Sequence, residues 1–484
     1  MSNSIADFHQ IRAAIAAIPG DVSNDAVGAF VPRLEEIYAP ETHSAALDAA
    51  TPIVVGPRGA GKSFWSGVLG QKETRLAAAK AYPKLKLDRL LVEFGFTGIV
   101  GGVDGVGVDA LLANVPMNSE PDVARAFWWA TILRAAERSG TIPKASSWSD
   151  LMKVGANFEE RDSLLAQYEQ SLRKKDNTLL VVYDALDVMA TNWPRRRMLT
   201  EALLEVVWAM RAYRNLCVKL FIRPDQIDDD ALRFVELPKL QTGAVRLTWR
   251  REDLYGLFFS RLSPEPAFKR LLKKGQIAPG TATAILTRKW QPSYDTDVQI
   301  QIMTWLAGTY MADGPNGYKK GKTYDWPVVH LADAFDEVTP RSFLGMMISA
   351  AKHGSAPDDR ALTPDGIRHG LRAASKTRVD QLHQEFQWIK GVLAPLAGLL
   401  LPQDDKDVFK TWKTAKTVTV LLKDAATHKY LPPFSAEGKT SERDLFLALE
   451  RIGVMFTRKD GRLDMPDLFR VAAKLLKKGG TTPL

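Results

Sequence analysis

The sequence has 484 residues, of which 45% are hydrophobic and 25% charged, and its formal net charge is +9. This composition is typical of a globular chain with a sizeable core in several domains, and the single cysteine, Cys217, excludes a disulfide framework and a cysteine-based zinc cluster. The basic charge suits a polyanionic partner such as nucleic acid but is modest over this length.

The first 50 residues predict an N-terminal arm, with a helical stretch that leads toward the first strand. No apolar run reaches the ~18 residues that a membrane span requires, and the amino terminus lacks the pattern of a secretory signal, so we expect a cytoplasmic protein. Five short β-branched runs then alternate with segments of helical period, which predicts a parallel sheet with crossover helices. The runs are 52–56, 89–96, 178–187, 217–225 and 245–249.

The first of these runs ends in the phosphate-loop pattern G-x-x-x-x-G-K-[ST], read here as GPRGAGKS. In such a loop the glycines let backbone N–H groups approach phosphate oxygens, Lys62 reaches the β- and γ-phosphates, and the Ser63 hydroxyl binds Mg²⁺. The predicted nucleotide-binding residues are Gly56, Pro57, Arg58, Gly59, Ala60, Gly61, Lys62, Ser63 and Phe64.

Residues 97–177 predict a helical insertion within a nucleotide-binding core that spans 51–250. After it, the apolar run "LLVVYDALD" ends in two carboxylates. Asp184 at the strand end fits the metal side of a phosphate site, and Asp187 could orient or activate water. A helix N-cap is the alternative role for either residue.

The segments "VVGPRGAGKSFW" and "VVYDALD" together resemble the P-loop ATPases of the AAA+ and STAND group, and the wording is closest to uncharacterised bacterial ATPases. The resemblance implies ATP and Mg²⁺ as ligands, and an extra strand between the phosphate-loop strand and the acidic strand. In STAND proteins a glutamate often follows the second aspartate. Val188 stands there instead, so the pattern does not assign the water-activating residue, and we expect slow hydrolysis.

The resemblance also implies residues that link the bound nucleotide to the conformation of the protein. Arg223 or Asp225 would lie near the γ-phosphate, residues 251–355 would form a helical lid, and Arg341 would be its nucleotide-facing arginine. An ordinary surface arginine at a helix start is the alternative for Arg341. The resemblance also implies that, in a homo-oligomer, one subunit supplies an arginine finger to the nucleotide site of its neighbour. The candidates for this arginine finger are Arg195, Arg196 and Arg197. The alternative is that these residues form the solvated start of a basic helix.

Residues 356–484 predict a C-terminal helical and winged-helix-like domain. A capped helix begins near Thr440, and a D-G turn at Asp460 joins two short alternating runs, which is typical of a hairpin. Such a unit could contact DNA or RNA phosphates, or it could pack on the core or on a protein. The basic candidates are Arg458, Lys459, Arg462, Lys474, Lys477 and Lys478.

The sequence therefore predicts an α/β fold, with a parallel-sheet P-loop NTPase core, a helical lid and a C-terminal winged-helix-like α+β unit. The function it favours is ATP binding and hydrolysis that drives a conformational change, and the resemblance implies a regulatory or phage-defence setting. Two alternatives stay open. One is a nucleotide-gated scaffold that recruits a protein effector with little turnover, and the other is a nucleic-acid-stimulated motor or loader.

Overall fold

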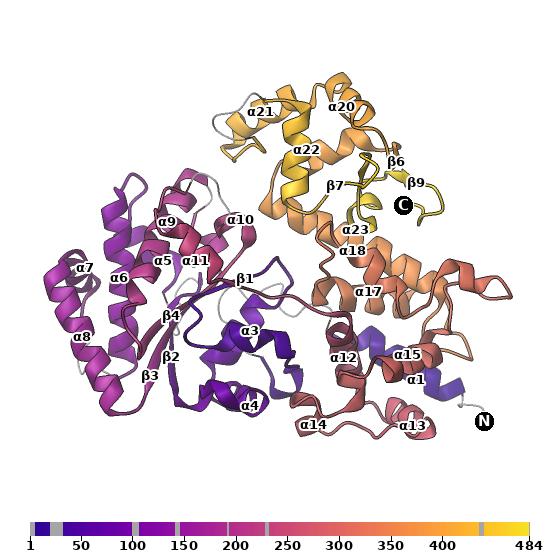
Figure 1. Ribbon diagram of the computed structural model, residues 1–484, viewed down its shortest axis with the longest axis horizontal. Helices are drawn as coiled ribbons and strands as arrows, with labels where there is room; N and C mark the ends of the chain where they lie inside the picture. Colours follow the sequence, from indigo (N-terminus) through magenta and orange to yellow (C-terminus); the bar gives the residue numbers. More distant parts are fainter. Residues whose placement is uncertain are drawn as a thin grey trace. The chain divides into compact units, whose positions relative to one another are not determined.

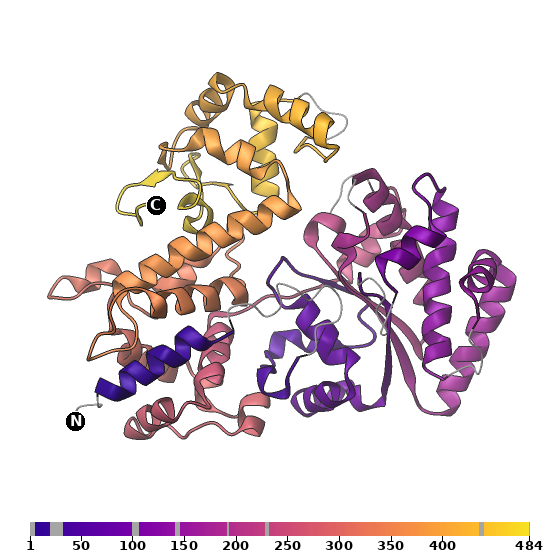
Figure 2. The ribbon, with the colours of Figure 1, turned by 180° about the vertical axis from the view of Figure 1, so that it is seen from behind.

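The computed structural model describes residues 5–19, 32–98, 106–140, 146–190, 193–227, 232–434 and 440–483. The chain divides into two compact units. One, the sheet unit, spans Ser23–Thr248, and the other, the helical unit, joins Met1–Val22 to Trp249–Leu484. Figures 1 and 2 show the chain from opposite sides.

A parallel five-stranded sheet is the centre of the sheet unit (Figure 1). Its strands run in the order β2-β3-β4-β1-β5, and every neighbouring pair is parallel. The strands are β1 (Ile53–Val55), β2 (Leu90–Phe96), β3 (Thr178–Tyr183), β4 (Leu216–Ile222) and β5 (Val245–Arg246). The extra strand expected between the phosphate-loop strand and the acidic strand is β4, and the α/β fold class is confirmed.

Helices cover this sheet, and alternate residues of β1, β3 and β4 share one hydrophobic core with α6 and α9. The helices of the sheet unit are α2 (Ser44–Leu47), α3 (Lys62–Gly70), α4 (Lys72–Ala81), α5 (Val108–Asn114), α6 (Pro121–Arg138), α7 (Trp148–Ala156), α8 (Phe158–Lys174), α9 (Trp193–Met210), α10 (Pro224–Ile227) and α11 (Leu237–Thr242). Helices α5 to α8 lie within the segment 97–177, of which 99–105 and 141–145 are outside the described residues.

A buried lysine anchors the segment that precedes β1. Lys219 lies on β4, is fully buried, and donates through Nζ to the carbonyl oxygens of Asp48 at 2.8 Å and Thr51 at 2.6 Å. Burial lowers the pKa of this ammonium to about 7. The contact fixes the amino end of β1, at the sheet edge opposite the phosphate loop.

The helical unit begins with the first helix of the chain, which packs against α12, α13 and α17. Asp7 on this helix accepts two hydrogen bonds from Arg270, at 2.9 and 2.6 Å. The helices here are α1 (Ile5–Ala17), α12 (Arg251–Leu262), α13 (Pro266–Lys274), α14 (Ala282–Leu286), α15 (Thr296–Ala307), α16 (Trp326–Leu331), α17 (Pro340–Lys352) and α18 (Pro364–Glu385). Because α17 and α18 pack together, residues on both sides of position 355 belong to one compact unit. Of the helices in the described ranges, none has the length and apolar character needed to cross a bilayer.

The end of the helical unit has winged-helix topology. Strands β7 and β8 form an antiparallel hairpin whose turn contains Gly461 at φ 84°, and Gln403 bridges to Leu463 on the outer side of β8. The elements are α19 (Ile389–Leu393), β6 (Leu400–Leu401), α20 (Asp405–Thr414), α21 (Thr417–His428), α22 (Glu442–Arg451), β7 (Phe456–Thr457), β8 (Leu463–Asp464), α23 (Asp467–Arg470) and β9 (Leu476–Lys477). The predicted helix-hairpin-helix order is present.

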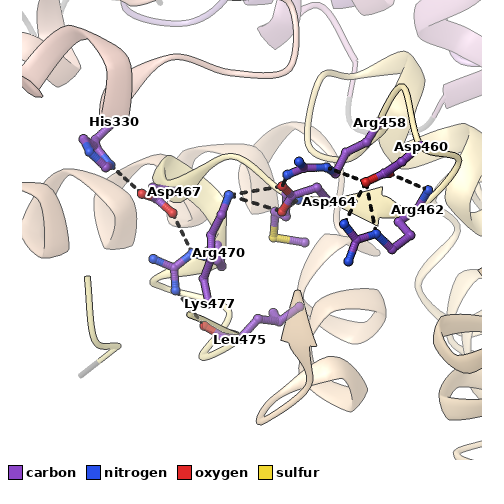
Figure 3. A network of polar contacts seen from close by, with 10 residues as sticks. His330, Arg458, Asp460, Arg462, Asp464, Asp467, Arg470, Leu475 and Lys477 are labelled. Carbon is purple, nitrogen blue, oxygen red and sulfur yellow. Dashed lines mark hydrogen bonds and ion pairs between the residues drawn. The ribbon is translucent and has the colours of Figure 1, made fainter. Parts of the chain in front are cut away.

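Carboxylates of the same unit form ion pairs with basic side chains at this hairpin (Figure 3). Arg458 lies 3.1 Å from Asp464, Lys477 lies 3.1 Å from the same carboxylate, and Arg462 lies 2.7 Å from Asp460. Three of the six basic candidates therefore take part in ion pairs within the chain. Because two carboxylates face three cations, these pairs leave one positive charge unbalanced.

A second carboxylate network ties the hairpin region to α16 (Figure 3). The ring nitrogen Nδ1 of His330 lies 2.5 Å from Asp467, and the buried Arg470 donates to Asp467 at 2.6 Å. Arg470 also donates to the carbonyl oxygens of Leu475 and Thr481, each at 2.9 Å. Burial alone would raise the pKa of Asp467, but His330 and Arg470 outweigh it and lower this pKa to about 2.

We expect Asp467→Asn to lower the free energy of unfolding of the helical unit by about 2 kcal/mol near neutral pH, because the depressed pKa stabilises the folded ionised form. Since the unfolded value is near 3.8, this contribution is complete above about pH 4 and is lost as the pH falls toward 2. Urea unfolding of the full chain at pH 7, 5, 4 and 3 measures it. The control Asp460→Asn, at an exposed pair, should change nothing measurable. A difference between Asp467→Asn and wild type that grows on acidification would contradict the assignment.

Candidate nucleotide-phosphate site

The GPRGAGKS segment forms a tight turn between β1 and α3. Gly59 and Gly61 have φ values of 87° and 107°, in the left-handed region that side chains with a Cβ rarely adopt. A Cβ on Gly56 would lie 3.2 Å from that of Ala60, so the loop closes tightly at its start. The amide of Trp65 donates to Gly61 at 3.0 Å and opens the first turn of α3. The loop therefore leads directly into a helix N-terminus, where free N–H groups favour an anion.

The lysine of the motif arches back over this turn. Its Nζ donates to the carbonyl oxygen of Gly56 at 2.7 Å and to that of Pro57 at 3.3 Å. The ammonium of Lys62 therefore lies over the loop backbone. Its charge opposes the rise that burial causes in the pKa of Asp184, and it helps Arg223 and Arg58 to lower that of Asp187.

The acidic strand places a buried carboxylate beside the phosphate loop. Asp184 directly follows β3, is 2% exposed, and donates its backbone N–H to Phe96 at 3.0 Å. Burial raises the pKa of its carboxyl, while hydrogen bonds from the Ala185 amide and the Ser63 hydroxyl and the charge of Lys62 act against that rise. The Oδ2 atom of Asp184 has no hydrogen-bond partner among the described residues.

Ser63 and Asp184 are therefore neighbours although 121 positions separate them in the chain. A hydroxyl and a buried carboxylate oxygen without a partner are oxygen ligands of the kind that suits a hard divalent cation such as Mg²⁺. The residues present thus fit the metal that the sequence implies, with Ser63 and Asp184 as the groups that would hold it.

A strained backbone residue turns the chain from Asp184 to Asp187. Ala185 has φ 56° and ψ 34°, a left-handed conformation that costs a residue with a Cβ on the order of 1 kcal/mol. The following residues form a 3₁₀ turn, Leu186–Val188. The left-handed conformation of Ala185 and the turn that follows direct the chain back, so that Asp187 faces the same loop as Asp184.

Asp187 lies between two guanidinium groups. Arg58 from the phosphate loop and Arg223 from the end of β4 each approach its Oδ2 atom at 3.4 Å. Arg223 is fixed further by a two-pronged contact with Asp225, at 2.9 and 2.7 Å. Burial alone would raise the pKa of Asp187, but Arg223, Arg58 and Lys62 outweigh it and hold that pKa below its ordinary value.

The pairing of Arg58 with Asp187 was not foreseen. The motif marks Arg58 only as a variable loop position, so the sequence contains no signal that it would meet a carboxylate 129 positions away. Arg223 and Asp225 were expected near this site, and both lie at its edge. Phe64 is half-buried on α3, with its ring edge-on to Trp65 at 5.5 Å.

Trp65 links α3 to the segments at either end of the sheet unit. Its indole N–H donates to Nδ1 of the buried His43 at 2.9 Å, and Nε2 of His43 donates to the carbonyl oxygen of Thr248 at 3.0 Å. Because the indole can only donate, His43 carries its proton on Nε2. No sequence motif identifies His43, and its contact with Trp65 holds the start of α3 in place.

The three consecutive arginines have different surroundings. Arg195 is buried and donates to the carbonyl oxygens of Val115 at 2.5 Å and Pro116 at 2.8 Å, so it is removed from the arginine-finger candidates. Arg196 donates to Ala190 at 2.8 Å and feels the charges of Arg223, Asp225 and Asp187, so it lies near the site of its own chain. Arg197 is half-buried on α9. A trans contact by Arg196 or Arg197 stays a prediction.

Arg341 lies in the first turn of α17, which the Thr339 hydroxyl caps by accepting the amide of Ser342 at 3.3 Å. It belongs to the helical unit, whereas the phosphate loop belongs to the sheet unit. Its role as the lid arginine stays a prediction.

Comparison with known proteins adds little to this geometry. No protein-family model matches the chain. No curated protein sequence is detectably similar to it. Among solved structures, Cdc6p from Pyrobaculum aerophilum is 11% identical over 92% of each chain with a TM-score of 0.29, and the ORC2 protein of Aeropyrum pernix is 13% identical over 94% of this chain and 93% of that one with a TM-score of 0.28. Scores this low carry no argument about the function of this chain.

We expect Asp184→Asn to stabilise the sheet unit by on the order of 1 kcal/mol, because it removes a buried charge whose Oδ2 atom is unpartnered. Hydrogen exchange of the β3 backbone amides in nucleotide-free buffer measures the change. Asp88→Asn, at an exposed position, is the matched control. Faster exchange in Asp184→Asn than in wild type would show that the carboxylate is satisfied within the fold.

Proposed function

We propose that this chain binds Mg²⁺-ATP on the 56–63 loop and hydrolyses it slowly, coupling the bound state to a change of conformation. The observation that carries the proposal is the convergence of Lys62, Ser63 and the unpartnered Asp184 oxygen at the carboxyl edge of the sheet. A loop alone could be a structural turn. A buried carboxylate set against its serine is costly for the fold, and metal binding explains why it is there.

Each residue then has a defined task. The loop amides and the first turn of α3 bind phosphate oxygens, and Lys62 balances the charge of the β- and γ-phosphates. Ser63 and Asp184 hold Mg²⁺, which when bound neutralises phosphate charge and orients the chain of phosphates. Asp187 positions the attacking water, because it is the second carboxylate at this edge and lies against the loop through Arg58.

The electrostatics of Asp187 favour slow turnover. Two arginines and a lysine lower its pKa, so its carboxylate is a weak base, and Val188 stands where a glutamate often assists. This favours, as a second candidate, a nucleotide-gated scaffold in which the bound nucleotide recruits a protein effector. A regulatory or phage-defence setting is what the resemblance supports.

Lys62→Ala should abolish measurable ATP and ADP binding, because it removes the cation opposite the β- and γ-phosphates. Isothermal titration calorimetry of the full chain with each Mg²⁺-nucleotide measures it, with Lys72→Ala in the next helix as the control. Wild-type affinity in Lys62→Ala would remove the loop as the nucleotide site.

Asp187→Asn should retain nucleotide binding while slowing steady-state ATP hydrolysis at least tenfold, about 1.4 kcal/mol in the barrier. Phosphate release is measured with Lys62→Ala as the blank. If Asp187→Asn turns over at the wild-type rate, another residue activates the water. A wild-type rate equal to the blank, with ATP still bound, selects the scaffold. Stimulation by DNA or RNA selects the motor.

A further inference from the structure

The two arginines that contact Asp187 differ in the exposure of their side chains. Arg223 is 6% exposed and is held on its other side by Asp225, which is 9% exposed. Arg58 is 31% exposed, and it belongs to the phosphate loop itself, next to Gly59. Arg223 is therefore held in the protein interior, whereas Arg58 is the more exposed of the two arginines that contact Asp187.

The contact of Arg58 with Asp187 is also a weak one. Its nitrogen lies 3.4 Å from Oδ2, longer than the 2.7–2.9 Å of a strong charge-assisted hydrogen bond. The same oxygen atom is shared with Arg223 at the same distance. A terminal phosphate offers several anionic oxygens and more negative charge than one shared carboxylate oxygen. Arg58 therefore gains by exchanging Asp187 for such a group when one lies over the loop.

We propose that Arg58 is the residue through which this site distinguishes a nucleoside triphosphate from a diphosphate, by leaving Asp187 to bind the terminal phosphate. The inference rests on the proposed function and adds to it. A diphosphate ends one phosphate short, so Arg58 stays on Asp187. With a triphosphate, Asp187 loses one of its two guanidinium partners and is released toward water. The contact between Arg58 and Asp187 is thus lost only when the third phosphate is present.

Competition for one arginine has a reciprocal consequence. If Asp187 and the terminal phosphate compete for Arg58, removing the carboxylate strengthens triphosphate binding by the free energy that the ion pair withheld. Removing the arginine weakens it. Both changes leave diphosphate binding nearly unaltered, which separates this role from simple support of the loop.

The test is calorimetric titration of the full chain with Mg²⁺-AMP-PNP, a non-hydrolysable triphosphate, and with Mg²⁺-ADP. Arg58→Ala should weaken AMP-PNP binding about tenfold, as expected for a lost hydrogen bond to a charged group, with ADP affinity changed less than about twofold. Arg58→Lys should recover part of the preference, because it keeps the charge. Asp187→Asn should strengthen AMP-PNP binding about threefold, the scale of a partly exposed ion pair. Arg211→Ala, at an exposed arginine over Trp208, is the matched control.

Equal weakening of both nucleotides by Arg58→Ala would overturn the proposal and make Arg58 a support of the loop. Unchanged or weaker AMP-PNP binding in Asp187→Asn would overturn the competition. The double variant Arg58→Ala/Asp187→Asn should bind AMP-PNP no better than Arg58→Ala, and a gain there would also contradict it. Wild-type protein that binds neither nucleotide would instead refute the proposed function.

Discussion

The parallel register of β1, β4 and β3 is the constraint on which the site depends. Ile53, Leu220 and Tyr183 lie in one row across these strands, so the chain leaves each strand at the same edge. Asp184 is one residue beyond this row. The phosphate loop begins at Gly56, whose amide donates to Ile222 at 3.1 Å across the β1–β4 edge. A slip of one residue in either pair would turn the side chains of that strand to the other face and separate Ser63 from Asp184.

Several charged side chains lie close together at this edge of the sheet. The free-energy cost of burying them differs from residue to residue. Asp187 is stabilised by arginines on both sides, whereas Asp184 is buried with one oxygen atom unpartnered and its pKa raised. The left-handed Ala185 between them adds backbone strain. Unfavourable terms that cluster in two adjacent residues are typical of a site retained for function, since the surrounding buried strands supply the stability that offsets them.

The helical unit uses its charges in the opposite way. Arg458, Arg462 and Lys477 meet Asp464 and Asp460, so two carboxylates balance two of these three positive charges. The pair formed by Asp467 and Arg470 joins this region to α16 through His330. The net charge of +9 is thus a poor guide to where a polyanion could bind, because pairing within the fold decides which cations remain exposed.

Local patterns were sufficient for the strands, the phosphate loop and the hairpin, because alternating apolar residues, glycine spacing and a D-G turn act over a few positions. They also identified Asp184 and Asp187 as strand-end carboxylates. Long-range contacts were beyond the sequence. The ion pair of Arg58 with Asp187 and the burial of Arg195 each depend on residues about 80 or more positions apart in the chain. The sequence by itself determined which phosphate-binding groups the loop carries. Only the tertiary structure decided which charged side chains pair with one another at the site, because sheet order and burial bring distant residues together.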